Sequence, residues 1–319
     1  MIPTIDALNL VIDRSDSSRL EQDLIKRRLR KALRRGKLID VVDNPDWKNR
    51  LATARLMLGD YTWVDWEHRS VWAQMCWLNE KEFGIPRWRG EEGKVLLLGE
   101  QGLGDEIMFS QYMPKNAELI CEERLVPVFE RNFGLKCHKR DIGKELTLAK
   151  RLISDGTFKS YCAIADIPRV TGYLGDGRAY FRPDPARLPE MEPYRNQVGI
   201  SWRGRNGQYK LSDFPTGLSL QYDIHWDEDA LVPHIDVKGD LEGIIALVSV
   251  QKKVITVSTT IAHIAGSLGI PTEVILAPWE TGTSNNMINF RWGLKRTVPW
   301  YKSVKVYQNM NEWKQYTLR

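Results

Sequence analysis

Residue types suited to acid–base chemistry and to anion binding meet in the segment E-Q-G-L-G-D at residues 100–105. Asp105 is a carboxylate that can accept a proton, and it follows glycines at Gly99, Gly102 and Gly104. Apolar residues at helical spacing come next, so the glycines lie at the start of a predicted helix. Backbone N–H groups at such a start suit an anion or the edge of a substrate. We therefore expect Asp105 and this turn to belong to a site.

A second candidate segment, V-S-T-T-I-A-H, occupies residues 257–263. A predicted strand ends at Ser258, and Thr259 and Thr260 then cap a helix whose first turn contains His263. Hydroxyl groups, exposed N–H groups and the helix dipole would converge there, as a diphosphate needs. The same residues fit equally well with an ordinary helix N-cap, in which the polar atoms of His263 find their partners within the packed domain.

The third candidate segment is the basic, glycine-containing loop S-W-R-G-R-N-G-Q-Y-K at residues 201–210. It follows a predicted strand, and Arg203, Arg205 and Lys210 can neutralise phosphate groups from it. A solvated basic loop is an equally good interpretation of the same residues.

The elements that would position these segments alternate along the chain between short apolar strands and helices. Strands are predicted at residues 95–98, 117–121, 135–138, 197–202, 253–257 and 271–276. Helices are predicted after the glycine turn and at residues 125–133, 241–250 and 260–268. This order predicts parallel, doubly wound sheets of the α/β class in two halves. A proline-rich stretch before residue 191 separates them, and we expect a helical region over 1–90 and domains over 91–190 and 191–319.

Composition places the chain among soluble globular proteins. It has 319 residues, of which 42% are apolar and 27% charged. No apolar run approaches the roughly 18 to 20 residues of a membrane span, and the start of the chain lacks a basic signal-peptide region. The four cysteines show no paired C-x-x-C spacing. These features predict a cytoplasmic protein with reduced thiols and no zinc site.

The N-terminal region contains two further patterns. Residues 26–37, K-R-R-L-R-K-A-L-R-R-G-K, form a basic face on a predicted amphipathic helix. A solvated surface explains this face, and so does contact with nucleic acid, another polyanion or an anionic membrane surface. Residues 51–66 predict a helical hairpin of the tetratricopeptide kind, present in one clear copy.

The glycine turn also invites comparison with dinucleotide-binding folds. Its spacing is G-x-x-G-x-G, whereas the dinucleotide fingerprint is G-x-G-x-x-G. Glu122 does follow the second strand, where a ribose-binding acid is expected. A lone match of this kind is weak, and a nicotinamide or flavin enzyme is a minor alternative.

Six segments in order carry a resemblance to a known family: LMLGDYTWVDWEHR, IPRWRGE, KVLLLGEQGLGDEIMFSQY, VGISWRGR, LSLQ and VSTTIAHIAGSLGIP. Together they cover about residues 50–280. Their order resembles bacterial glycosyltransferases associated with tetratricopeptide repeats. These are related to the ADP-heptose lipopolysaccharide heptosyltransferases and more distantly to the O-GlcNAc transferases. The resemblance implies a GT-B fold, in which two Rossmann-like domains face a cleft. It also implies a nucleotide-sugar donor held mainly by the C-terminal domain, and usually no metal ion.

Matched position by position, the resemblance implies that Asp105 is the base in the EQGLGD turn. It places the donor's diphosphate near residues 258–261 and His263, with Arg203 as a further contact. The chain departs from the family in two places. Ser258 stands where the family usually has Asp, in V-D-T-A-x-A-H, and the stretch from Arg203 to Leu218 is too short for a helix usual in the family.

The resemblance therefore implies transfer of a sugar from a nucleotide-sugar donor to an acceptor hydroxyl, with inversion by analogy to heptosyltransferases. No separate cofactor is implied. The acceptor is expected to be a glycan or lipid-linked sugar, with a protein side chain or a modified nucleic-acid base as alternatives. A catalytically degenerate binding or scaffold protein of the same fold is the main alternative from another class, and Ser258 favours it.

Overall fold

The computed structural model describes residues 52–53, 55–63, 66, 80–100, 102–141, 144–204, 207–222, 224, 230–276 and 291–317. The chain divides into two compact units. One comprises residues 1–79, 168–172 and 279–295, and the other comprises 80–167, 173–278 and 296–319. The predicted basic helix at 26–37 lies outside the described residues. The division into domains at residues 90 and 190 stays a prediction.

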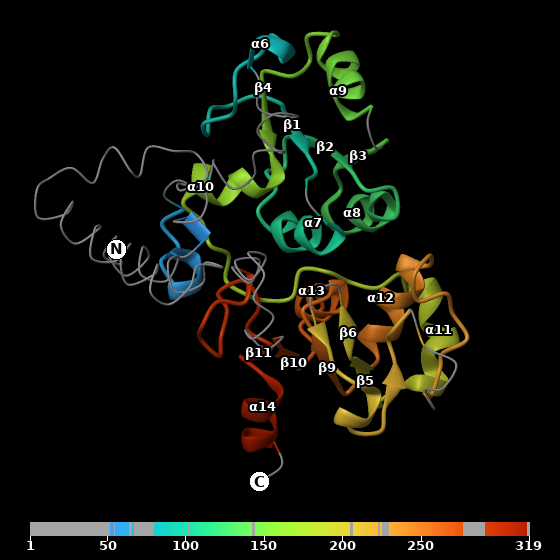
Figure 1. Cartoon of the computed structure of the whole chain (residues 1–319). Helices are drawn as coiled ribbons and strands as arrows, with labels where there is room; N and C mark the ends of the chain where they lie inside the picture. Colours follow the sequence, from blue (N-terminus) through green and yellow to red (C-terminus); the bar gives the residue numbers. More distant parts are fainter. Residues whose placement is uncertain are drawn as a thin grey trace, which may run out of the picture. The chain divides into compact units, whose positions relative to one another are not determined.

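The first sheet of the larger unit is parallel and has the strand order β3-β2-β1-β4 (Figure 1). Its strands are β1 (Val95–Leu98), β2 (Ala117–Cys121), β3 (Lys136–Lys139) and β4 (Ser160–Ala163). Its helices are α7 (Leu103–Ser110), α8 (Leu125–Phe133) and α9 (Glu145–Ile153), with the short α6 (Glu80–Phe83) before them. All residues of β1, β2 and β4 are buried, as expected for parallel strands covered on both faces.

The second sheet is also parallel and has the order β11-β10-β9-β5-β8. Its strands are β5 (Val198–Ser201), β8 (Leu218–Ser219), β9 (Lys253–Val257), β10 (Thr272–Ile275) and β11 (Val304–Tyr307). Its helices are α12 (Leu241–Ser249), α13 (Thr260–Ser267) and α14 (Met310–Thr317). Directly after β5, the chain makes a small antiparallel pair from β6 (Arg203–Gly204) and β7 (Gly207–Gln208).

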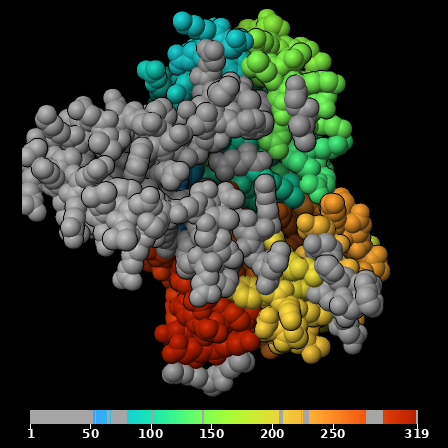
Figure 2. All heavy atoms as spheres, viewed as in Figure 1, coloured from blue at the N-terminus to red at the C-terminus, as the bar shows by residue number. Residues whose placement is uncertain are grey.

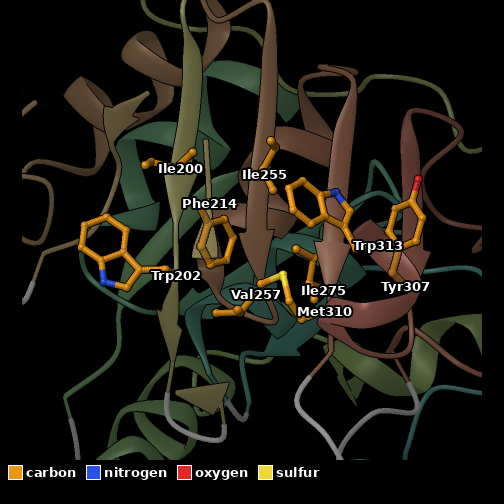
Figure 3. Close-up of a cluster of buried hydrophobic side chains, with 9 residues drawn as sticks. All are labelled: Ile200, Trp202, Phe214, Ile255, Val257, Ile275, Tyr307, Met310 and Trp313. Carbon is orange, nitrogen blue, oxygen red and sulfur yellow. The ribbon is translucent and has the colours of Figure 1, made fainter. Parts of the chain in front are cut away.

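A cluster of large apolar side chains covers one face of this second sheet (Figure 3). Ile200 on β5, Ile255 on β9 and Ile275 on β10 come from neighbouring strands, and Trp313 packs against them from α14. The indole N–H of Trp313 donates to Glu273 Oε2 at 2.7 Å. The C-terminal helix therefore completes the core of this sheet.

The same helix is joined to the segment around residue 210 by an ion pair. Lys314 Nζ and Asp213 Oδ1 are 3.5 Å apart, and the two segments lie next to each other in the space-filling view (Figure 2, red and yellow).

The sequence predicted the class and most elements of both sheets correctly. The strands at 95–98, 117–121 and 253–257 and the helix at 125–133 have the predicted bounds. Strand β4, S-Y-C-A, was missed because it is short and none of its residues is β-branched, so little in its composition favours a strand. The side chains of Cys121, Cys137 and Cys162 are buried, and the structure places none of these three in a disulfide.

The smaller unit is described only in part. Residues 55–58 are helical, and Gly59 then adopts a φ of +86°, which ends the helix as the sequence predicted. Asp60 Oδ1 accepts hydrogen bonds from the backbone N–H and the hydroxyl of Thr62. The predicted second helix of the hairpin lies mostly outside the described residues.

Candidate active site at the carboxyl ends of the strands

Both sheets reverse their strand order beside the segments that the sequence singled out. In the first sheet, β1 lies between β2 and β4, so the connections leave it in opposite directions. The glycine turn follows β1 at this point. In the second sheet, β5 lies between β8 and β9, and the loop with Arg203 and the turn with Ser258 follow β5 and β9. Ligands of open α/β sheets bind at such points, outside the carboxyl ends of the strands.

Asp105 is held by the turn that it belongs to. It is the third residue of α7, and its Oδ2 accepts a hydrogen bond from the N–H of Gly102 at 3.1 Å. Only 6% of Asp105 is exposed. The carboxylate therefore closes the N-terminus of α7, as the acid of a capping box does, and it has a fixed orientation.

The next residue, Glu106, is a fully buried acid that the sequence interpretation did not single out. Its carboxylate is 3.0 Å from Arg140 Nη1 and accepts a hydrogen bond from the N–H of Glu122 at 3.0 Å. Burial raises the pKa of Glu106 to about 7, and the charge of Arg140 acts in the opposite direction. A Cβ at Gly99 would lie 2.7 Å from Glu106 Oε1, so glycine is needed there to admit the carboxylate. Glu106 therefore ties the ends of β1, β2 and β3 together beneath the turn.

The N-terminus of α13 is open to solvent. Ser258 is exposed, and Thr259 and Thr260 are half-buried. Thr259 is the N-cap residue by backbone conformation, but its side chain makes no capping hydrogen bond. Its hydroxyl lies 3.2 Å from that of Thr256. The predicted helix terminus is therefore present, with the exposed Ser258 at the positive end of the helix dipole.

Gly204 brings the basic loop against this helix terminus. A Cβ at Gly204 would lie 2.9 Å from Thr259 Cγ2 and 3.4 Å from the carbonyl oxygen of Ser258. Arg203, one residue before, is half-buried, and its guanidinium lies 5.6 Å from the ring centre of Trp202. The structure thus brings the loop that carries Arg203 to the α13 terminus. Arg205 lies outside the described residues.

Gln221 holds the loop in this position. Its Oε1 accepts hydrogen bonds from the N–H of Arg203 at 3.0 Å and from Ser201 Oγ at 3.1 Å. Only 3% of Gln221 is exposed, and its own N–H donates to Ser219 Oγ. It therefore links the ends of β5 and β8. The sequence signal for it was its place at the end of the L-S-L-Q segment.

His263 contacts the glycine turn of the first sheet. A Cβ at Gly104 would lie 2.6 Å from His263 Cδ2 and 3.3 Å from Nε2, so the two helices α7 and α13 meet at this glycine. Only 3% of His263 is exposed. Its Nδ1 is 3.0 Å from the hydroxyl of Tyr301, a residue that the sequence interpretation did not single out. Gly104 is therefore in contact with α13 and leaves room for the imidazole.

Among the described residues, no three His, Cys, Asp or Glu side chains gather closely enough to hold a metal ion. Nor is any helix in the described part of the chain long and apolar enough to cross a membrane.

Comparison with known proteins gives one curated relative and several solved structures. No protein-family model matches the chain. It is 29% identical over 282 residues to Protein FlbA of Caulobacter vibrioides, an alignment that covers 70% of this chain and 46% of FlbA. The chain thus spans about half the length of this relative.

The solved structures include a glycosyl transferase family 9 protein from Veillonella parvula, at 13% identity and a TM-score of 0.48. That match covers 72% of this chain and 93% of the other. They also include the E. coli ADP-heptose lps heptosyltransferase II, at 12% identity and a TM-score of 0.44, covering 67% of this chain and 90% of the other. The described part of this chain is an α/β protein with two parallel sheets.

Proposed function

We propose that this chain is a glycosyltransferase of GT-B type, which moves a sugar from a nucleotide-sugar donor to an acceptor hydroxyl without a metal ion. The observation that carries the proposal is the convergence at α13. The basic loop with Arg203 meets the open helix terminus through Gly204, and α7, which carries Asp105, meets the same helix through Gly104. Both meeting points lie beside the strand-order reversals of their sheets.

In this proposal Asp105 accepts the proton of the acceptor hydroxyl while the oxygen attacks the anomeric carbon of the donor. The bond from that carbon to the diphosphate breaks, and the nucleoside diphosphate leaves with the bonding electrons. Arg203 and the terminus of α13 at Thr259 and Thr260 stabilise the negative charge of the leaving group. Ser258, at the same terminus, replaces the acid usual in the resembled family and bears on which donor is bound.

The test is to incubate the full chain with a panel of nucleotide sugars that includes ADP-heptose, and to measure nucleoside diphosphate release and thermal shift. We expect one donor to be turned over. Asp105→Asn should lower kcat by about 10²- to 10⁴-fold, the usual contribution of a general base. Asn keeps a side-chain oxygen for the N–H of Gly102, so the helix cap survives and the loss reports proton transfer.

Asp213→Asn is the matched control. Asp213 Oδ2 also accepts a hydrogen bond from the N-cap N–H three residues earlier, in this case Lys210, at 3.1 Å. It closes a short 3-10 helix (Leu211–Asp213) and has no place in the proposed chemistry. We expect this variant to keep wild-type turnover. Full activity of Asp105→Asn, or no donor turned over by the wild type, would contradict the proposal.

A catalytically degenerate binding protein is the second candidate, and Ser258 at the position of the usual acid favours it. In that case a nucleoside diphosphate or nucleotide sugar would raise the melting temperature without any product release. The same assay distinguishes the two candidates, since it records binding and turnover separately.

The acceptor class and the arrangement of the predicted domains belong to the same proposal. A glycan or lipid-linked sugar is the acceptor that we favour. A hydroxylated nucleic-acid base would instead require DNA binding that weakens steeply with salt, since phosphate contacts release counterions.

A further inference from the structure

Tyr301 lies beneath α13 in the segment that leads into β11, and it is fully buried. Its ring occupies the space that a side chain at Gly266 would need, because a Cβ there would lie 2.6 to 2.8 Å from three ring atoms. Its hydroxyl is 3.0 Å from Nδ1 of His263, one helical turn before Gly266. The ring and the hydroxyl of Tyr301 are therefore both fixed against the same face of α13.

The imidazole of His263 is fixed on both edges. Its Nδ1 faces Tyr301, and its Cδ2–Nε2 edge faces Gly104 in the first turn of α7. The exposed fraction of His263 is 3%, which leaves little of the ring for a direct contact with a donor in solution. Its position suits a contact with α7, next to the candidate base Asp105, better than a contact with the diphosphate.

Burial raises the pKa of the Tyr301 phenol well above its usual value, so the phenol keeps its proton. The hydroxyl of Tyr180 is a second hydrogen-bond partner of Tyr301, and it donates to the carbonyl of Ile107 on α7 at 2.8 Å. The contact between Tyr301 and His263 therefore belongs to a buried polar cluster that reaches α7.

We propose that Tyr301 is a positioning residue, whose hydroxyl forms a hydrogen bond with Nδ1 of His263 and holds the imidazole against the first turn of α7. The titratable side chains that act on Tyr301, among the residues that the structure describes, include His263, Tyr180, Tyr112 and Asp105. The consequence for function rests on the proposed transferase activity: the pair keeps the turn with Asp105 in register with α13.

The direct test is nitrogen NMR of the full chain with 15N-labelled histidine. The chain has five histidines, and the His263 signals are assigned by their loss in His263→Gln. In Tyr301→Phe we expect the Nδ1 signal to move, because that nitrogen loses its hydrogen-bond partner. An unchanged His263 spectrum in Tyr301→Phe would overturn the proposal.

Tyr112→Phe is the matched control. Tyr112 is also a buried tyrosine, but its hydroxyl donates to the carbonyl of Leu174 at 3.0 Å. We expect this variant to keep the wild-type His263 signals. Because NMR needs no donor, it decides the role of Tyr301 even if the wild type turns over no nucleotide sugar.

With an active donor, Tyr301→Phe should lower kcat about 10-fold, the loss expected for one hydrogen bond, and leave KM for the donor within about twofold. A rise in KM with kcat unchanged would instead assign the His263–Tyr301 pair to donor binding and would overturn the positioning role.

Discussion

At single positions of the site, three glycines are needed because they have no side chain and leave room for a neighbouring group. Gly99 admits the carboxylate of Glu106, Gly104 admits the ring of His263, and Gly204 admits the methyl group of Thr259. The backbone φ angle is not positive at any of these three glycines. Close approach between elements, and not backbone freedom, therefore requires glycine at each of them.

The contact between Gly104 and His263 predicts that Gly104→Ala changes the free energy of unfolding in opposite directions in the wild type and in a His263→Ala variant. In the wild type, Gly104→Ala should lower the free energy of unfolding by about 1–3 kcal/mol, because the added methyl group overlaps the imidazole. In a His263→Ala background the overlap is gone, and the same change should be neutral or stabilising by up to about 1 kcal/mol, since alanine favours a helix. Urea unfolding of the four proteins measures both effects. An equal cost in the two backgrounds would rule out this contact.

At the level of helices and strands, the position of the loop after β5 depends on Gln221, which follows β8. Gln221→Ala removes the acceptor for the N–H of Arg203 and for Ser201 Oγ, which should cost about 1–3 kcal/mol of stability. Because the loop meets the α13 terminus, we also expect the affinity for the released nucleoside diphosphate to fall about 10-fold, roughly the energy of one hydrogen bond. Calorimetric titration measures that affinity.

Gln251→Ala is the control for this prediction. Gln251 is buried in the same half, and its amide donates to the carbonyl of Leu247 at 2.9 Å. It precedes β9, at the amino ends of the strands and away from the candidate site. We expect a loss of stability with unchanged affinity. Equal losses of affinity in both variants would mean that the effect of Gln221 is one of general stability.

The elements themselves were largely predictable from the sequence. The run V-L-L-L between glycines gave β1 its bounds, and K-V-I-T-V gave those of β9. Strand β4 was not predicted, because S-Y-C-A is short and has no β-branched residue; it becomes a strand by pairing with β1. The pairing order was also beyond the sequence pattern, since apolar runs say which strands are buried and not which strands are neighbours.

At the scale of the whole molecule, Glu106 links the fold to pH. Burial raises its pKa from 4.5 to about 7 in the folded protein. The folded chain therefore binds this proton more tightly than the unfolded chain, and stability falls as the pH rises through that window. The Glu106→Gln variant has no carboxyl group at this position and does not lose this contribution. Between pH 4.5 and 7, the free energy of unfolding of the wild type should therefore fall by about 3 kcal/mol relative to that of the variant.

Urea unfolding of the wild type and Glu106→Gln at pH 5 and pH 8 measures this shift. Both proteins carry the other ionisable groups, so their contributions cancel in the difference. A stability difference independent of pH would show that the Glu106 carboxyl titrates near its ordinary value in the folded chain.

Residue order alone predicted the α/β class, most strand and helix bounds, and the segments that carry Asp105, Arg203 and Ser258. Local patterns suffice for these, because burial, helix starts and motif spacing depend on neighbours along the chain. The folded structure was needed to show that α7 meets α13 at Gly104, that Glu106 is buried beside Arg140, and that Tyr301 reaches His263. Such contacts join residues far apart in the sequence, and they depend on strand order and on close packing, which no local pattern encodes.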